Sequence, residues 1–317
     1  MRIVAFYLPQ FHPIPENDAW WGAGFTEWSN VARARPLFRG HHQPRLPGEL
    51  GFYDLRLPDT RSAQADLARD HGIEGFCYYH YWFSGRRLLE RPLDEARRTG
   101  EPDFPFCLCW ANETWSRRWI GEERDVLVAQ AYSAEDDLDH ARWLLGPFSD
   151  PRYLRVGGRP LYLVYRPRDL PQPHRTTDLI RDECARAGCA EPWLVGVDAH
   201  CPGFDCRVLG FDDTLVFAPQ LGALRAVWTG QWSARRFVRN LRHGAMQGTT
   251  QIFGYPQALR AMERQRPTIF HIPCVFPGWD NSPRRGRSSM VIRQATSRQF
   301  RAALERACSL ASKRPAE

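Results

Sequence analysis

The chain has 317 residues, of which 43% are hydrophobic and 25% charged, with 12 tryptophans and a formal net charge of +7. This composition is ordinary for a soluble globular protein. Arginine carries nearly all of the positive charge, because Lys313 is the only lysine, but the arginines are interleaved with Asp and Glu. No basic run is combined with an aromatic platform, so we do not expect a nucleic-acid partner. A solvated surface explains the excess, although a phosphate-bearing substrate is compatible with it because arginine binds phosphate bidentately.

Short apolar runs alternate with stretches of helical periodicity. The apolar runs predict parallel strands buried on both faces, at 2–7, 74–81, 104–110, 160–165, 193–198, 214–218 and 269–275. Helices are predicted at 60–71, 86–98, 134–145, 174–187, 233–243, 255–265 and 296–312, with Asp59 and Ser133 as N-caps. Strands that alternate with helices, without a Gly-rich phosphate loop, predict an α/β protein with a (β/α)8 TIM-type barrel that is incomplete at about seven strands.

A single domain accounts for this pattern, with residues 1–308 in the barrel and residues 309–317 as a frayed tail. The segment from Pro9 to about Pro58 contains no convincing strand and no long helix. It is too aromatic to be disordered, with Trp20, Trp21, Phe25, Trp28, Phe38 and Tyr53. We therefore expect a long aromatic loop after strand one that folds over one end of the barrel.

The N-terminal apolar stretch is too short for a signal peptide, and no run of about 18 apolar residues suggests a membrane span. The sequence therefore predicts a cytoplasmic protein without a membrane span. The nine cysteines fit reduced thiols in such a compartment. Two pairs, Cys184 with Cys189 and Cys201 with Cys206, have loose spacing for zinc, so neither a metal nor another cofactor is expected.

The active site of a (β/α) barrel forms where its strands end and its loops begin. Aromatic side chains dominate these positions here, beside a few carboxylates, amides and imidazoles. Rings stack on the apolar faces of sugars and polar groups fix the hydroxyls. The candidate substrate-binding residues are Tyr7, Gln10, His12, Trp21, Trp28, Tyr79, Tyr81, Trp82, Trp110, Asn112, Trp115, Tyr165, Trp279, Asp280 and Asn281.

Glu113 is the first candidate for catalysis, because Asn112 and two flanking tryptophans would partly desolvate it, as suits a general acid. Glu27, within Gly24-Phe25-Thr26-Glu27-Trp28, is the second, since glycoside chemistry uses two carboxylates. Each could instead be an N-cap or an arginine partner. Histidines in such aromatic surroundings are more often packing residues than ligands. No paired-histidine metal motif, P-loop, dinucleotide fingerprint or hydrolase nucleophile elbow is present.

At these strand ends the sequence resembles the WbsX-like family of bacterial polysaccharide-biosynthesis proteins, which is related to glycoside hydrolase family 99. The matching stretches lie at 7–18, 20–22, 24–31, 75–83, 88–93, 109–115 and 278–285, and they include Tyr7-Leu8-Pro9-Gln10-Phe11-His12 and Cys109-Trp110-Ala111-Asn112-Glu113-Thr114-Trp115. They follow the family's order over nearly the whole chain.

The resemblance implies a (β/α)8 barrel and an oligosaccharide or polysaccharide substrate in O-antigen or capsule assembly. Family members are labelled glycosyltransferases, which implies a nucleotide sugar, whereas the related hydrolases cleave α-mannosides with retention. The family's last strand carries an Asn-Glu-Trp-x-Glu-Gly motif whose glutamates match the catalytic pair of family 99. This sequence lacks that motif, which predicts a truncated or altered barrel.

Two functions therefore stay open. The chain is a carbohydrate-active enzyme that cleaves or transfers glycosyl units of a surface polysaccharide, or it is an inactive or truncated barrel that only binds glycans. A barrel without its eighth strand has two unpaired edges, which suit a protein partner.

Overall fold

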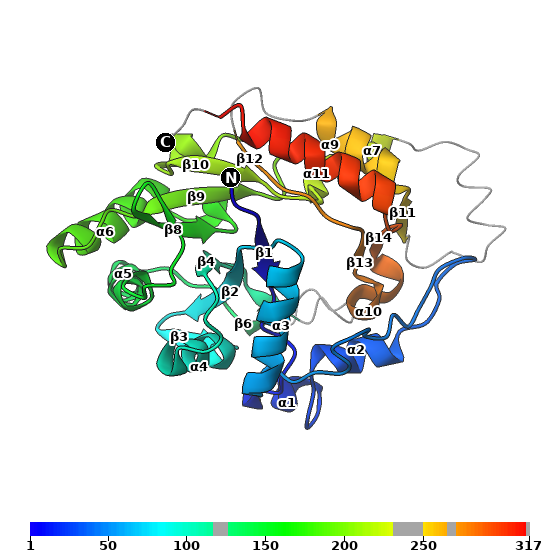
Figure 1. The fold of residues 1–317 in the computed structure, drawn as a ribbon, viewed down its shortest axis with the longest axis horizontal. Coiled ribbons are helices and arrows are strands. Elements are labelled where there is room, and N and C mark those ends of the chain that lie inside the picture. Colours follow the sequence, from blue (N-terminus) through cyan, green and yellow to red (C-terminus); the bar gives the residue numbers. More distant parts are fainter. Residues whose placement is uncertain (117–125, 231–249, 265–270, 315–317) are drawn as a thin grey trace.

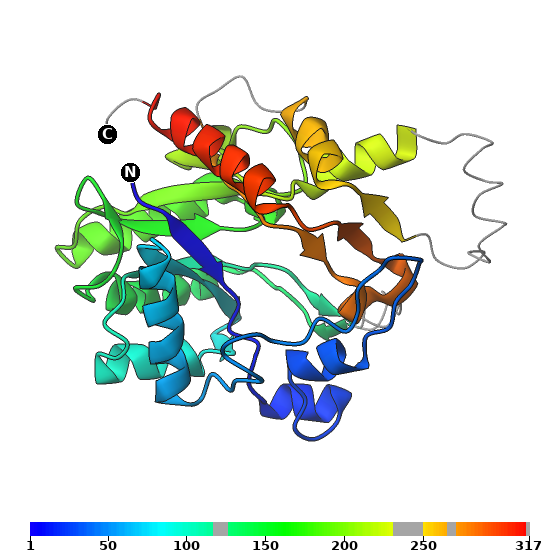
Figure 2. The same cartoon turned by 45° about the vertical axis from the view of Figure 1, so that its right-hand side comes forward.

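Seven parallel strands form one curled sheet in the computed structural model, which describes residues 1–116, 126–230, 250–264 and 271–314 (Figure 1, Figure 2). In sheet order they are β1 (Val4–Tyr7), β2 (Gly75–Phe83), β4 (Phe106–Trp110), β8 (Arg159–Val164), β9 (Trp193–Asp198), β10 (Asp213–Val216) and β12 (Ile272–Pro273). The sheet curls into a half-barrel. This confirms the predicted fold class and the count of seven strands.

The half-barrel has two edge strands within the described part of the chain. β1 pairs only with β2, and β12 pairs only with β10. The pairing of β12 is short, with Leu215 opposite Ile272 and Val216 opposite Pro273. Two residues of the expected seventh strand, 269 and 270, lie outside the described residues.

Helices connect the strands and lie around the outside of the curled sheet (Figure 1). They are α3 (Pro58–Asp70), α4 (Arg91–Thr99), α5 (Ala134–Phe148), α6 (Pro173–Arg186), α7 (Leu221–Gly230), α9 (Tyr255–Glu263) and α11 (Ser297–Ala311). None of these helices, nor any other in the described ranges, is long and apolar enough to cross a bilayer. The predicted helix at 233–243 lies outside the described residues.

Local chemistry explains where the helices begin. The Ser133 hydroxyl accepts a hydrogen bond from the backbone N–H of Asp136, which confirms Ser133 as an N-cap. Asp59 is not one, because Pro58 starts α3 one residue earlier and Asp59 lies in its first turn. The helix expected from residue 86 begins at Arg91, since β3 (Arg86–Leu88) turns back antiparallel onto β2.

Small strands outside the barrel were missing from the sequence prediction. β11 (Gln251–Phe253), β14 (Met290–Ile292) and β13 (Trp279–Asp280) form a separate three-stranded sheet. The pair β5 (Trp115–Ser116) and β6 (Val126–Val128) and the short β7 (Arg155–Val156) are hairpin elements. Strands of two or three residues are too short to show the alternation that identifies a strand in a sequence.

The segment after β1 contains two short helices, α1 (Pro15–Trp21) and α2 (Glu27–Arg33), and otherwise runs as a long loop. Its aromatic residues pack on one another: the ring centroids of Phe11 and Trp28 are 4.6 Å apart, and the Trp28 indole donates to the Tyr53 carbonyl at 2.8 Å. Further along, the loop reaches α10 (Ser282–Arg285), beside the three-stranded sheet (Figure 2). The predicted long aromatic loop is therefore an ordered segment that joins β1 to the C-terminal part of the fold.

Candidate functional site

Four aromatic rings meet inside the curled sheet, two from β1 and β2 and two from the residues that directly follow β8 and β10. Phe6 stacks on Tyr79 with centroids 5.5 Å apart, and Tyr79 contacts Tyr165 edge-on at 5.8 Å. Phe217 closes the cycle, at 5.3 Å from Phe6 and 5.6 Å from Tyr165. This cycle forms an apolar base for the barrel mouth, where the active sites of such folds are built.

A chain of polar groups lies beside this base. The Gln10 amide donates to the Tyr81 hydroxyl at 2.9 Å, and its carbonyl accepts from the Arg284 guanidinium. Arg284 Nε also binds Glu27 Oε2 at 2.8 Å. Three parts of the sequence, the end of β1, the start of α2 and α10, thus meet around one arginine.

Local structure fixes Glu27 at this point. Thr26 is the N-cap of α2 and shares a capping box with Ser29, so Glu27 is the first residue of the helix. Its side chain is only 6% exposed, and Arg284 is its ion-pair partner. A buried carboxylate needs such a partner, because an unpaired charge is costly away from water.

Glu113 is more open to solvent than Glu27. It follows β4, its side chain is 40% exposed, and Arg166 Nη1 binds its Oε1 at 3.1 Å. Both glutamates therefore have an arginine partner. Arg117 and Arg118, which are nearer to Glu113 in sequence, lie outside the described residues.

Tyr81 connects the two glutamates electrostatically. Burial raises the pKa of the Tyr81 phenol well above its ordinary value, Arg284 and the Gln10 hydrogen bond oppose this, and Glu113 and Glu27 add to it. The negative charges of both carboxylates therefore act on the pKa of the same hydroxyl. The Trp115 ring stands edge-on to the Tyr81 ring at 5.0 Å and completes this side of the mouth.

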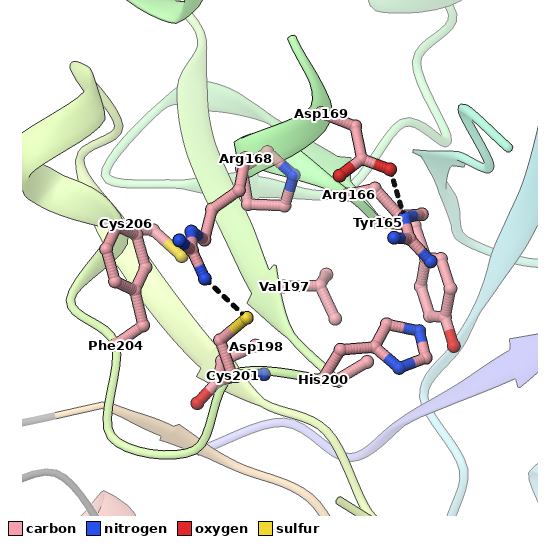
Figure 3. A pocket seen from close by; sticks show the side chains of 12 residues that line it. Tyr165, Arg166, Arg168, Asp169, Val197, Asp198, His200, Cys201, Phe204 and Cys206 are labelled. Atoms are coloured by element: carbon pink, nitrogen blue, oxygen red, sulfur yellow. Dashed lines mark hydrogen bonds and ion pairs between the residues drawn. The ribbon is translucent and has the colours of Figure 1, made fainter. Parts of the chain in front are cut away.

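A shallow pocket continues from the mouth along the ends of β8 and β9 (Figure 3). Tyr165, His200 and Arg166 line one side, and Arg168 and Phe204 line the other. Asp198 lies at its base, where burial raises the pKa of this carboxyl to about 6 although hydrogen bonds from Cys201, Gly203 and Gln220 oppose the shift.

Asp280 is held in place by the long loop. Its Oδ2 accepts from His41 Nε2 at 2.9 Å and from Gln43 Nε2 at 2.7 Å, and its Oδ1 accepts from the Ser282 backbone. Burial alone would raise the pKa of Asp280, but the hydrogen bonds from Ser282, His41 and Gln43 outweigh it and lower the pKa. This carboxylate fixes the loop to α10.

Several predicted site residues face away from the mouth. In β2 the side chains alternate, so Tyr79 and Tyr81 point inward while Trp82 packs against α5 and donates to Asp136 at 2.8 Å. Trp110 is 1% exposed and lies edge-on to His140 of the same helix. Tyr7 donates to Gln64 of α3 at 2.6 Å. These three aromatic residues belong to the layer between sheet and helices.

Other predicted residues have structural partners. Asn112 is 1% exposed and clamps the backbone of Arg166, accepting from its N–H at 2.8 Å and donating to its carbonyl at 2.9 Å. Asn281 accepts from the Met290 N–H at 2.8 Å beside the start of α10. His12 is 1% exposed, and burial lowers its pKa to about 4.

The remaining predicted aromatic residues lie around the rim or in a second core. Trp21 is partly exposed and tilts over Phe25 at 5.9 Å, and Trp28 packs inside the long loop. Trp279 packs into the small hydrophobic core under the three-stranded sheet. The structure thus brings Gln10, Glu27, Tyr79, Tyr81, Glu113, Trp115 and Tyr165 together at the mouth.

Sequence reasoning missed the two arginines and two of the aromatic rings. Arg166 and Arg284 resemble any other arginine in this arginine-rich chain, and nothing in the sequence links Arg284 to Glu27. Phe6 and Phe217 are apolar residues within apolar runs and look like core. Among the residues that the structure describes, no group of three or more His, Cys, Asp or Glu could hold a metal ion.

Comparison with known proteins identifies the family of this chain. The sequence model described as glycosyltransferase WbsX matches residues 3–317. The chain belongs to the WbsX family. A curated relative, the uncharacterized protein WxcX of Xanthomonas campestris pv. campestris strain B100, is 47% identical over 306 residues. The alignment covers 94% of this chain and 42% of that relative, so the chain spans about two fifths of its length.

Solved structures share the fold of this WbsX-family chain. The family 99 endo-α-mannosidase of Bacteroides thetaiotaomicron aligns with a TM-score of 0.52 and 12% identity, over 98% of this chain and 80% of the enzyme. A glycoside hydrolase-like protein aligns with a TM-score of 0.53 and 12% identity, over 96% of this chain and 79% of that one. At this identity the likeness establishes the barrel fold alone.

Proposed function

We propose that this WbsX-family chain is a carbohydrate-active enzyme that cleaves or transfers glycosyl units of a bacterial surface polysaccharide, with Glu27 and Glu113 as its pair of carboxylates. One observation carries the proposal: Glu27 is joined to the Tyr81 hydroxyl through Arg284 and Gln10, and Glu113 lies two residues before Trp115, whose ring contacts Tyr81. Glycoside chemistry uses a pair of carboxylates on either side of the bond that breaks.

The surroundings of the pair support a sugar substrate. The cycle of Phe6, Tyr79, Tyr165 and Phe217 gives the mouth an aromatic base, and Trp115 gives it an aromatic wall. Polar groups that bind hydroxyls, from Gln10, Tyr81 and Arg284, lie beside these rings. A site of this kind combines stacking surfaces with a few fixed donors and acceptors.

The two glutamates have different surroundings. Glu27 is buried and held by Arg284, which fixes its position against the substrate, whereas Glu113 is exposed enough to exchange protons with water or with a leaving group. The likeness to an endo-α-mannosidase makes α-mannosides the first substrates to test. A nucleotide sugar is the corresponding donor if the chain transfers rather than cleaves.

The test is turnover of a panel of α-linked oligosaccharides, α-mannosides included, with and without nucleotide-sugar donors. Products are followed by mass spectrometry and binding by calorimetry. Glu27→Gln and Glu113→Gln should each abolish turnover and leave binding largely intact, while the exposed Glu305→Gln should change neither. Turnover that is unchanged in both site variants would remove these glutamates as catalysts. Binding without turnover in the unmodified chain would favour a glycan-binding barrel instead.

A further inference from the structure

Two segments that lie near the candidate site contain arginines and no acidic residue. Residues 28–48 contain four arginines and residues 281–304 contain six. Their positive charge is therefore not balanced by a neighbour within either segment.

The fold brings these two segments together. His41 and Gln43 of the first segment bind Asp280, which immediately precedes the second, and Gln43 also binds Ser282 at 3.3 Å. In Figure 2 the loop after α2 lies over α10. Segments more than 230 positions apart in the sequence are therefore in contact where Gln43 meets Ser282.

Many of the arginines in these two segments are exposed to water. Arg33, Arg35, Arg39, Arg287 and Arg293 are all exposed, and none of them forms an ion pair with any residue that the structure describes. We call these five residues the arginine face. Most arginines elsewhere behave differently; Arg159, for example, binds Glu191 and Asp212. Unpaired like charges repel one another, so this arrangement suits a negatively charged ligand.

The arginine face adjoins the candidate site. Arg33 ends the helix α2 that Glu27 begins, and Arg287 follows α10, which provides Arg284. The ion pair between Glu27 and Arg284 joins these two helices. A chain-like ligand that extends from the mouth along α2 and α10 would therefore reach the arginine face.

We propose that the arginine face binds an acidic glycan, one that bears carboxylate or phosphate groups, and guides it into the barrel mouth. This inference rests on the proposed function, because it takes the mouth as the place where a glycan is processed. Arginine suits both kinds of anion, since its planar guanidinium pairs bidentately with carboxylate and with phosphate. The substrate class is thereby narrowed from glycans in general to acidic ones.

The experiment compares matched glycans. Polygalacturonate is compared with its methyl ester, and phosphorylated dextran with plain dextran, so that each pair differs only in charge. Binding to the whole chain is measured by calorimetry at low and at moderate salt. A five-residue variant replaces every member of the arginine face by Gln. A control variant with the same change in net charge replaces five exposed arginines elsewhere, namely Arg69, Arg98, Arg175, Arg186 and Arg207.

We expect at least one acidic glycan to bind, its neutral counterpart to bind more weakly, and added salt to reduce the difference. The arginine-face variant should bind the acidic glycan about tenfold more weakly, as the sum of several exposed ion pairs that each contribute little. The control variant should keep full affinity. Thermal melting of both variants shows that they remain folded.

Three outcomes would overturn the proposal: equal affinity for charged and neutral glycans, equal losses in the two variants, or tighter binding of single-stranded DNA or anionic phosphatidylserine vesicles than of either acidic glycan. Turnover of small neutral oligosaccharides should be unaffected in the arginine-face variant. If only the arginine-face proposal fails, the unmodified chain still shows turnover. If the catalytic proposal fails, the unmodified chain shows no turnover, so the two failures are distinguished.

Discussion

Replacing Arg284 by Met should destabilise the fold, because Arg284, whose side chain is 28% exposed, satisfies two buried acceptors at once. Its guanidinium binds Glu27, whose side chain is 6% exposed, and the carbonyl of Gln10, a residue that is also 6% exposed. Methionine keeps the length of the side chain but cannot donate. A hydrogen bond to a charged group contributes about 1.5–3 kcal/mol and a neutral one about 1 kcal/mol, so we expect a loss of about 2–4 kcal/mol.

Urea unfolding at neutral pH measures this loss as a change in the transition midpoint at constant slope. Arg287→Met is the control, because Arg287 is exposed and has no ion-pair partner among the residues that the structure describes, so its loss should cost less than about 0.5 kcal/mol. In the Glu27→Gln background the buried charge is gone, so Arg284→Met should cost about 1–2 kcal/mol less than in the unmodified chain. A small loss for Arg284→Met, or equal losses in the two backgrounds, would refute the reasoning.

Three further changes test the packing around the site. Trp82→Phe removes a buried indole hydrogen bond and should lower the free energy of unfolding by about 1–2 kcal/mol, with glycan binding unchanged. Weaker glycan binding would show that Trp82 belongs to the binding site after all. Gly196→Ala should cost about 1–3 kcal/mol by overpacking, because a Cβ there would lie 2.3 Å from the Cys206 Cβ; an unchanged melting temperature would contradict that contact. Burial lowers the pKa of His80 well below its ordinary value and that of His140 to about 3. Both imidazoles stay neutral in the fold, whereas in the unfolded chain they take up protons near pH 6.5. The free energy of unfolding is therefore highest above about pH 6.5 and falls with the pH, by about 2 kcal/mol per imidazole between about pH 7.5 and pH 5. His140→Leu should flatten this pH dependence in urea titrations. An equally steep dependence in the variant would argue against a contribution from buried, neutral His140.

The strand ends show how far the sequence could predict the site. Position at or after the strand ends suggested Gln10, Tyr81 and Glu113 as site residues, because parallel strands bring their carboxyl ends to one side. The same rule failed for Trp82 and Trp110. Both faces of these strands are buried, so the residues are apolar on both sides and the alternation of polarity that would identify the inner face is absent.

The sequence by itself determined the order of strands and helices along the chain, including the seven parallel strands and most of the helices around them. These follow from local periodicity, which depends only on neighbouring residues. The tertiary structure alone decided which side chains meet: Glu27 and Arg284 are 257 positions apart, and so the pair cannot be read from either neighbourhood. It also decided that two acid-free segments are in contact, and charge acts through space whatever the distance in sequence.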